Sequence, residues 1–138
     1  MCLAAVTPTP DGAHVVVSSA GHPLPLLVRG DGEVAEVGRP GSLLGVLTDL
    51  RVHEVTFDLG PGDALVLFTD GITERRSGGG GQFDEHLIGT LRGIAGAPAT
   101  ELARQVEEAA VAFGTGVPED DMAVLAIGVP GSPGRGAT

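Results

Sequence analysis

The segment "ALVLFTDGITE" (residues 64–74) joins a wholly apolar run to an Asp-Gly pair. The apolar run, 64–68, predicts a central β-strand in a buried position. Asp70 follows this strand directly, and a carboxylate that is buried there costs several kcal/mol unless it is paired, hydrogen-bonded or bound to a metal. Two interpretations are open: a turn, because Asp-Gly is common at hairpin corners, or a ligand of a cation.

Upstream of this segment, short apolar runs alternate with turn residues. The Val-rich run 14–19 predicts a strand buried on both faces. Runs 24–29 and 33–37 flank a Gly-Asp-Gly turn and predict a hairpin. Residues 52–59 alternate between apolar and polar side chains, which is typical of a half-buried strand. Strands as close in sequence as 52–59 and 64–68 are most simply antiparallel.

The second half of the chain has a different period. Helices are predicted at 84–95 and at 98–113, where Pro98 suits the start and apolar residues recur at helical spacing. A last apolar run, 122–129, predicts a final strand, and 130–138 reads as a disordered tail. The pattern predicts an α+β fold with mainly antiparallel sheets in a single domain, residues 1–129.

Composition excludes several classes of function. The chain has 138 residues and a formal net charge of −10, which argues against a nucleic-acid surface and an anionic membrane as partners. The single cysteine, Cys2, excludes an internal disulfide and a thiolate metal cluster. No apolar run reaches the ~18 residues of a membrane span. We interpret the chain as cytoplasmic, with no membrane partner for this segment.

Acidic residues follow one predicted strand and precede another. Asp70 ends the strand 64–68, and the acidic run 119–121 comes before the strand 122–129. If these strands are antiparallel neighbours, the carboxylates converge at one rim of the sheet, where oxygen ligands favour Mg²⁺, Mn²⁺ or Ca²⁺. Ordinary acidic turns remain the alternative. His22, in a rigid Gly/Pro corner, is either a turn residue or a further group on this rim.

Five segments occur in the order and rough spacing of one protein family: "SSAGHPLPLLV" (18–28), "LLGVL" (43–47), "LGPGDALVLFTDGITE" (59–74), "QFDEHLIGTL" (82–91) and "PEDDMAVLAI" (118–127). Together they resemble the metal-dependent serine/threonine phosphatases of the PPM (type 2C) class, in the bacterial SpoIIE/RsbU-like branch. The match covers nearly the whole chain up to Val129. Any single motif is a weak signal, but five in order are a strong one.

The resemblance implies two packed antiparallel sheets flanked by helices. It also implies two Mn²⁺ or Mg²⁺ ions whose activated water hydrolyses phosphoserine or phosphothreonine. The matching motifs place metal ligands at Asp70 and Asp120. Further metal or supporting residues follow from the same motifs: Gly71, Asp121, Gly21 and His22. Relatives of this branch act on phosphorylated STAS-type anti-anti-sigma proteins in partner-switching pathways, so such a protein is the expected partner.

The family pattern also includes an upstream GDVxGHG segment, whose aspartate bridges both metals. Nothing in these 138 residues matches it. We therefore expect an N-terminally incomplete domain that is weakly active or inactive, with exposed sheet edges that favour association into homo-oligomers. The alternatives are a catalytically dead pseudophosphatase or regulatory protein-binding module, and a decayed gene fragment.

Overall fold

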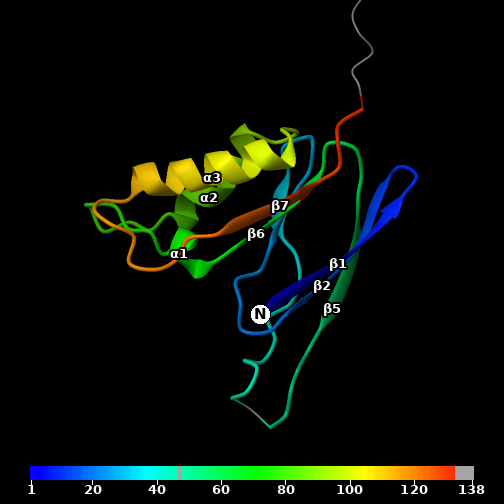
Figure 1. Ribbon diagram of the computed structural model, residues 1–138, viewed down its shortest axis with the longest axis horizontal. Coiled ribbons are helices and arrows are strands. Elements are labelled where there is room, and N and C mark those ends of the chain that lie inside the picture. Colours follow the sequence, from blue (N-terminus) through cyan, green and yellow to red (C-terminus); the bar gives the residue numbers. More distant parts are fainter. Residues whose placement is uncertain (47, 133–138) are drawn as a thin grey trace, which may run out of the picture.

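In the computed structural model of the chain, the described residues, 1–46 and 48–132, form two antiparallel sheets and a layer of helices (Figure 1). Sheet A has the order β1-β2-β5, with β1 at Cys2–Thr9, β2 at Gly12–Ser19 and β5 at Glu54–Leu59. Sheet B has the order β4-β3-β6-β7, with β3 at Leu26–Val28, β4 at Val34–Glu36, β6 at Ala64–Phe68 and β7 at Val124–Gly128. Of the expected tail at 130–138, residues 133–138 lie outside the described part of the chain.

Strand β6 is central, as its apolar sequence predicts. It pairs with β3 on one side and with β7 on the other, antiparallel in both cases. Val66 faces the core beneath the helices, whereas Leu65 faces the core between the two sheets, and both are fully buried. Because each face of β6 meets a different layer, no polar residue is tolerated in its interior.

The β3–β4 hairpin is confirmed, but the simplest reading of β5 and β6 as antiparallel neighbours is wrong. Strand β5 pairs with β2 in sheet A, and the turn after it carries the chain across to sheet B. Asp63 fastens this crossing: its carboxylate accepts hydrogen bonds from the main-chain N–H groups of Gly30 and Gly60, both at 2.9 Å, and from Arg29 at 2.7 Å. The short turn is therefore a link between layers.

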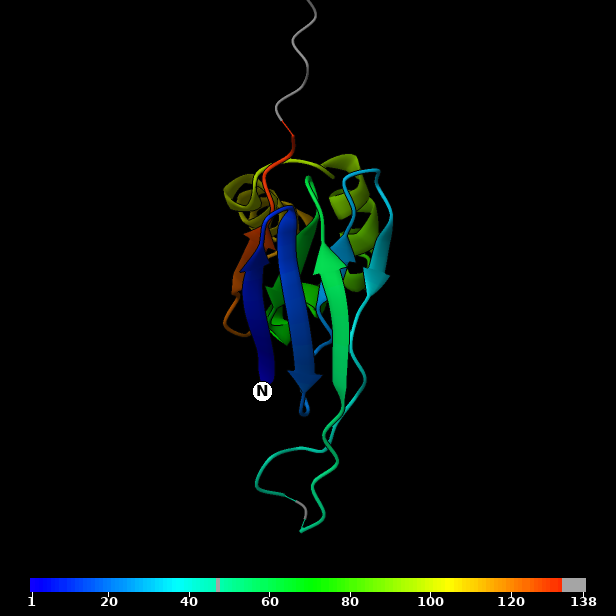
Figure 2. The same ribbon diagram turned by 90° about the vertical axis from the view of Figure 1, so that its right-hand side faces the viewer.

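Strand β2 is buried on one face only, which corrects the expectation of burial on both. Val15 and Val17 are fully buried between the sheets, whereas His14 is exposed on the outer face. Figure 2 shows why: sheet A stands in front, and the helices of the described residues lie behind sheet B. A run of valines predicts a strand, but which faces are covered depends on the other layers.

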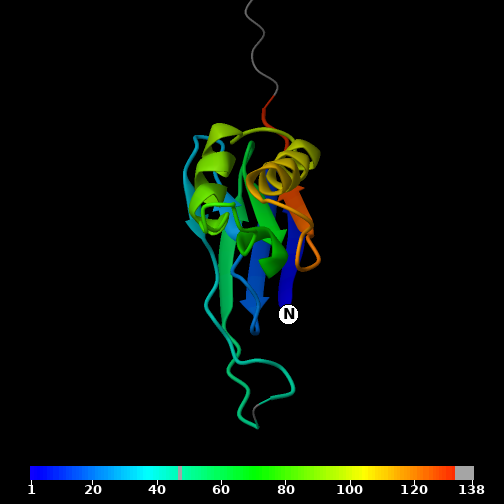
Figure 3. The same cartoon turned by 90° about the vertical axis from the view of Figure 1, so that its left-hand side faces the viewer.

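Two helices lie side by side over the outer face of sheet B (Figure 3). They are α2 at Asp84–Gly93 and α3 at Ala99–Phe113. Helix α3 begins after Pro98 and ends before Gly114, as predicted, and it buries Leu102, Val106 and Ala110. A single helical turn, α1 at Asp70–Thr73, was not expected from the sequence. Within the described residues, no helix has the length and apolar character needed to cross a membrane.

Candidate metal centre

The antiparallel pairing of β6 with β7 brings two acidic segments to one end of sheet B. Phe68 lies opposite Val124 in this pairing. Beyond it, Thr69 continues the contact: its N–H donates to the carbonyl of Ala123 at 3.0 Å. The Thr69 hydroxyl donates to the carbonyl of Asp121 and accepts from the N–H of Ala123, each at 3.0 Å. The predicted proximity of these two strand ends is confirmed.

Gly71 brings the two acidic segments into direct main-chain contact. A Cβ atom at this position would lie 2.3 Å from the carbonyl oxygen of Asp121 and 3.3 Å from that of Asp120. Any larger residue would therefore push the two segments apart. Asp70, the neighbour of Gly71, and Asp120 are thus carried by stretches of backbone that touch.

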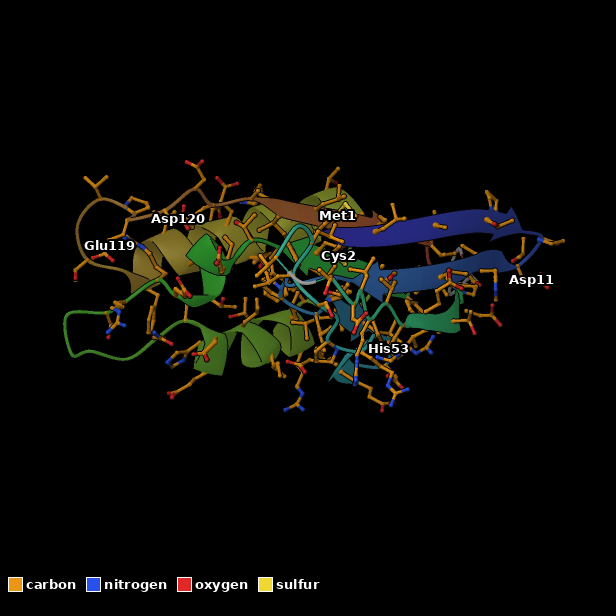
Figure 4. The ribbon with its side chains drawn as sticks, turned by 90° about the horizontal axis from the view of Figure 1, so that it is seen from below. Met1, Cys2, Asp11, His53, Glu119 and Asp120 are labelled. Atoms are coloured by element: carbon orange, nitrogen blue, oxygen red, sulfur yellow. The ribbon has the colours of Figure 1, made fainter. Side chains whose placement is uncertain are left out.

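The carboxylate of Asp70 is exposed, so the premise that it sits in a buried position is wrong. Asp70 opens α1, where its carbonyl accepts from the N–H of Glu74 at 2.8 Å. Asp120 is exposed as well, and one of its carboxylate oxygens accepts from the N–H of Asp121 at 2.8 Å. Within residues 1–46 and 48–132, neither carboxylate forms an ion pair with a basic side chain. Figure 4 shows Asp120 at the end of the molecule opposite Asp11.

This arrangement fits part of a site for a hard divalent cation. Mg²⁺ prefers oxygen ligands, keeps several of its waters and is commonly bound through one or two carboxylates. Asp70 and Asp120 offer two such carboxylates on the water-facing side of a fixed backbone. The described residues contain no group of three or more His, Cys, Asp or Glu side chains that could hold a metal ion. The chain therefore offers two carboxylates and leaves other ligand positions to water or to further groups.

The Gly21-His22 corner lies near this rim. His22 lines a cavity of about 180 Å³ together with Thr69 and Ala123. The corner is rigid: Gly21 has a φ of +64°, and a Cβ there would lie 2.0 Å from a methyl carbon of Leu43. The His22 Nδ1 atom lies 2.9 Å from the carbonyl oxygen of Pro23. His22 is thus placed beside the strand end that leads to Asp70.

Arg75 also belongs to this end of the molecule, although it was not among the residues expected there from the sequence. It lines a second cavity, of about 160 Å³, with Gly71 and Asp120. The only signal in the sequence is its place directly after the "TDGITE" motif, because eight arginines occur in the chain and nothing local marks this one as buried.

The family of the chain follows from a comparison with protein-family models. The model of Stage II sporulation protein E (SpoIIE) matches residues 1–130. The chain belongs to the SpoIIE family. A comparison with curated proteins gave no match.

Solved structures agree with this assignment. The phosphatase domain of SpoIIE from Bacillus subtilis, in a Mn-presoaked form, has 22% identity and a TM-score of 0.71, with 95% of this chain and 57% of that chain covered. The RsbU and RsbW domains of Rv1364c from Mycobacterium tuberculosis have 27% identity and a TM-score of 0.74, with 96% and 36% covered. The SiaA-PP2C domain of Pseudomonas aeruginosa has 23% identity and a TM-score of 0.66, with 84% and 50% covered.

These likenesses establish the fold of a PP2C-type phosphatase and, with the family match, membership of that protein phosphatase family by resemblance. The two antiparallel sheets and the helices over sheet B are the part of that fold present here. The chain spans 57% of the B. subtilis phosphatase domain and smaller shares of the other two structures.

Proposed function

We propose that this chain is the part of a SpoIIE-type phosphatase domain that binds metal through Asp70 and Asp120. The reaction is the hydrolysis of phosphoserine or phosphothreonine on a regulatory protein. The observation that supports it most is the main-chain contact at Gly71, which keeps the two acidic segments together while both carboxylates stay exposed. The close-packed backbone brings the two segments together, and exposed carboxylate oxygens remain available to a cation.

Each residue of the rim has a distinct part in this proposal. The carboxylates of Asp70 and Asp120 hold Mn²⁺ or Mg²⁺, Asp121 stands beside them, and Gly71 permits the close approach. When bound, the ion lowers the pKa of a coordinated water and neutralises charge on the phosphoryl oxygens. The corner formed by Gly21 and His22 supports the rim from the side of β6.

A phosphorylated protein of the STAS-type anti-anti-sigma class is the proposed substrate. The similarity to the RsbU and RsbW domains of the M. tuberculosis protein supports a place in a partner-switching system. The loop between β4 and β5 projects from the sandwich (Figures 1 and 2). It exposes a set of large apolar side chains that suits a protein surface: Leu43, Leu44, Val46, Leu50 and Val52.

A second function is favoured by one observation. The described residues supply two acidic ligands and no group of three. Since positioning and charge neutralisation carry most of phosphoryl-transfer catalysis, two carboxylates alone support weak activity at most. A regulatory module that binds the partner without hydrolysing its phosphate is therefore the alternative proposal.

The first test is a thermal melt with and without millimolar Mn²⁺ on the wild type, on Asp70→Asn and on Asp11→Asn. Asp11 is an exposed carboxylate at the β1–β2 turn, so it is a matched control at the far end of the molecule. Mn²⁺ at 100 times its Kd should add about 2.7 kcal/mol to the stability of the wild type. We expect Asp70→Asn to abolish this gain and Asp11→Asn to retain it.

An equal Mn²⁺ shift in the Asp70→Asn variant would remove Asp70 from the site. The second arm measures Mn²⁺-dependent release of phosphate from a phosphoserine peptide. Release that Asp70→Asn abolishes supports the phosphatase, whereas a Mn²⁺ shift without any release supports the binding module.

A further inference from the structure

Arg75 is buried although its guanidinium carries a full positive charge. The residue is 7% exposed, and no carboxylate within the described part of the chain pairs with it. A buried guanidinium without a direct ion pair is costly, because it has given up hydration that no close partner replaces. Its Nε atom is moreover buried without a hydrogen-bond partner in the described residues. The place of Arg75 in the fold therefore depends on its remaining contacts.

The hydrogen bond of the Arg75 side chain leads to the segment between α3 and β7. Its Nη2 atom donates a hydrogen bond of 2.7 Å to the carbonyl oxygen of Gly116. The neighbouring Arg76 adds a main-chain bond, because its carbonyl accepts from the N–H of Thr115 at 3.2 Å. Residues 75–76 therefore fasten the start of the loop that runs on to Asp120.

Gly114 makes room for the guanidinium. A Cβ atom at this position would lie 1.9 Å from the Nε atom of Arg75 and 2.2 Å from its Cζ atom. Gly114 has a φ of −79°, which any residue can adopt, so the glycine is needed here for space and not for its backbone conformation. The side chain of Arg75 and the bare backbone of Gly114 thus form one close-packed contact.

The cavity of about 160 Å³ that Arg75 lines connects the contact between Arg75 and Gly114 to the candidate metal centre. Its walls include Gly71, Arg75 and Asp120. The segment that carries Asp120 is thus held on both sides: Thr69 bonds to Asp121 and Ala123 after it, and Arg75 bonds to Gly116 before it. The cavity also contains the charged side chains of Glu74, Arg76 and Glu119.

We propose that Arg75 is a positioning residue, which holds the loop 114–118 so that Asp120 stays beside Asp70. This inference rests on the proposed function and deepens it. Arg75 acts through the loop and does not itself bind the ion. Groups that orient metal ligands typically change metal affinity about 10- to 100-fold when they are removed, and we expect a loss in that range for Arg75→Met.

If Arg75 acted only through its positive charge, Coulomb's law would predict that its removal strengthens metal binding. Removing a positive charge close to a cation site should strengthen cation binding. Arg76→Met is the matched control, because Arg76 lines the same cavity, is exposed and loses the same charge. We expect Arg76→Met to bind Mn²⁺ as tightly as the wild type or more tightly, whereas Arg75→Met binds it more weakly.

Three further variants separate the effect of the contact from the effect of the charge. Gly114→Ala keeps both arginines but drives the guanidinium from its place, so it should weaken Mn²⁺ binding as Arg75→Met does. The double variant, Arg75→Met with Gly114→Ala, should bind Mn²⁺ no more weakly than either single variant, since both changes break the same contact. Arg75→Lys retains a donor for the carbonyl of Gly116 and should recover part of the affinity.

The measurements are Mn²⁺ titrations followed by electron paramagnetic resonance, and amide hydrogen exchange of residues 114–121 without metal. We expect faster exchange in Arg75→Met and in Gly114→Ala than in Arg76→Met. Wild-type binding of Mn²⁺ together with unchanged affinity in Arg75→Met would overturn the inference. If the wild type binds no Mn²⁺, the proposed function fails, and the exchange rates still decide whether Arg75 holds the loop. If Arg75→Met does not fold, Gly114→Ala and Arg75→Lys give the same comparison.

Discussion

The substitution Gly71→Ala tests the contact on which the candidate site depends. The added methyl group would start 2.3 Å from the carbonyl oxygen of Asp121, which belongs to the main chain and not to a flexible side chain. The two segments must separate by about 1 Å before this contact reaches the 3.4 Å of ordinary van der Waals packing. No relaxation of a rotamer can relieve it.

A separation of that size also breaks hydrogen bonds. The Thr69 hydroxyl bonds to Asp121 and to Ala123 at 3.0 Å in each case, and neither bond survives a displacement of 1 Å. Overpacking costs about 1–3 kcal/mol, and a lost hydrogen bond about 1 kcal/mol. Because these losses overlap, we expect Gly71→Ala to lower the free energy of unfolding by about 2–4 kcal/mol.

Urea unfolding at pH 7 without metal measures this loss, and Gly89→Ala is its matched control. Gly89 lies inside α2, where an added methyl meets no atom within 4 Å. The same chemical change should there stabilise the protein by about 0.5–1 kcal/mol, because alanine favours the helix. If the free energy of unfolding of Gly71→Ala lies within about 0.5 kcal/mol of the wild-type value, the two acidic segments are not in contact and the site as described does not exist.

Two further predictions concern the core and the crossing between the sheets. Leu65→Ala, in the fully buried middle of β6, should lower the free energy of unfolding by about 2–5 kcal/mol in urea. Leu125, on β7, is 59% exposed, so Leu125→Ala should lower it by less than about 0.5 kcal/mol. Equal losses would contradict the layered core. Burial alone would raise the pKa of Asp63, but hydrogen bonds from Gly30, Gly60 and Arg29 outweigh it and lower this pKa. The contribution of Asp63 to stability is therefore full above the ordinary carboxyl pKa of about 4 and is lost as the pH falls through its lower folded value. In urea unfolding at several pH values, the free energy of unfolding should fall less steeply in acid for Asp63→Asn than for the wild type. An equally steep fall in both proteins would show that Asp63 does not contribute to acid unfolding.

The elements that the sequence predicted well are those whose pattern has one physical explanation. A strand that is apolar throughout needs cover on both faces, so the central place of β6 followed from residues 64–68 alone. Helix α3 combines a helical period with Pro98 before it and Gly114 after it. The closeness of the two acidic segments followed in turn, because β6 and β7 were the two apolar strands next to acidic residues.

What the sequence could not predict depends on contacts between distant segments. The alternation in β5 shows that one face is buried, but not that its partner is β2, some 40 positions earlier in the chain. The burial of Arg75 depends on the missing side chain of Gly114, and each residue taken alone has an ordinary pattern. Such pairs become visible only when the chain is folded.

The exposure of Asp70 changes the reason for expecting a cation there. A buried carboxylate would demand a partner for the stability of the fold, but an exposed one makes no such demand. Gly71 is the residue that now points to a site, because the first turn of a helix accepts alanine without cost and only the backbone of residues 120–121 forbids it. The close approach constrains the main chain and leaves the carboxylate oxygens in water. A close-packed backbone that carries two water-facing carboxylates leaves room for an ion to bind between the two segments.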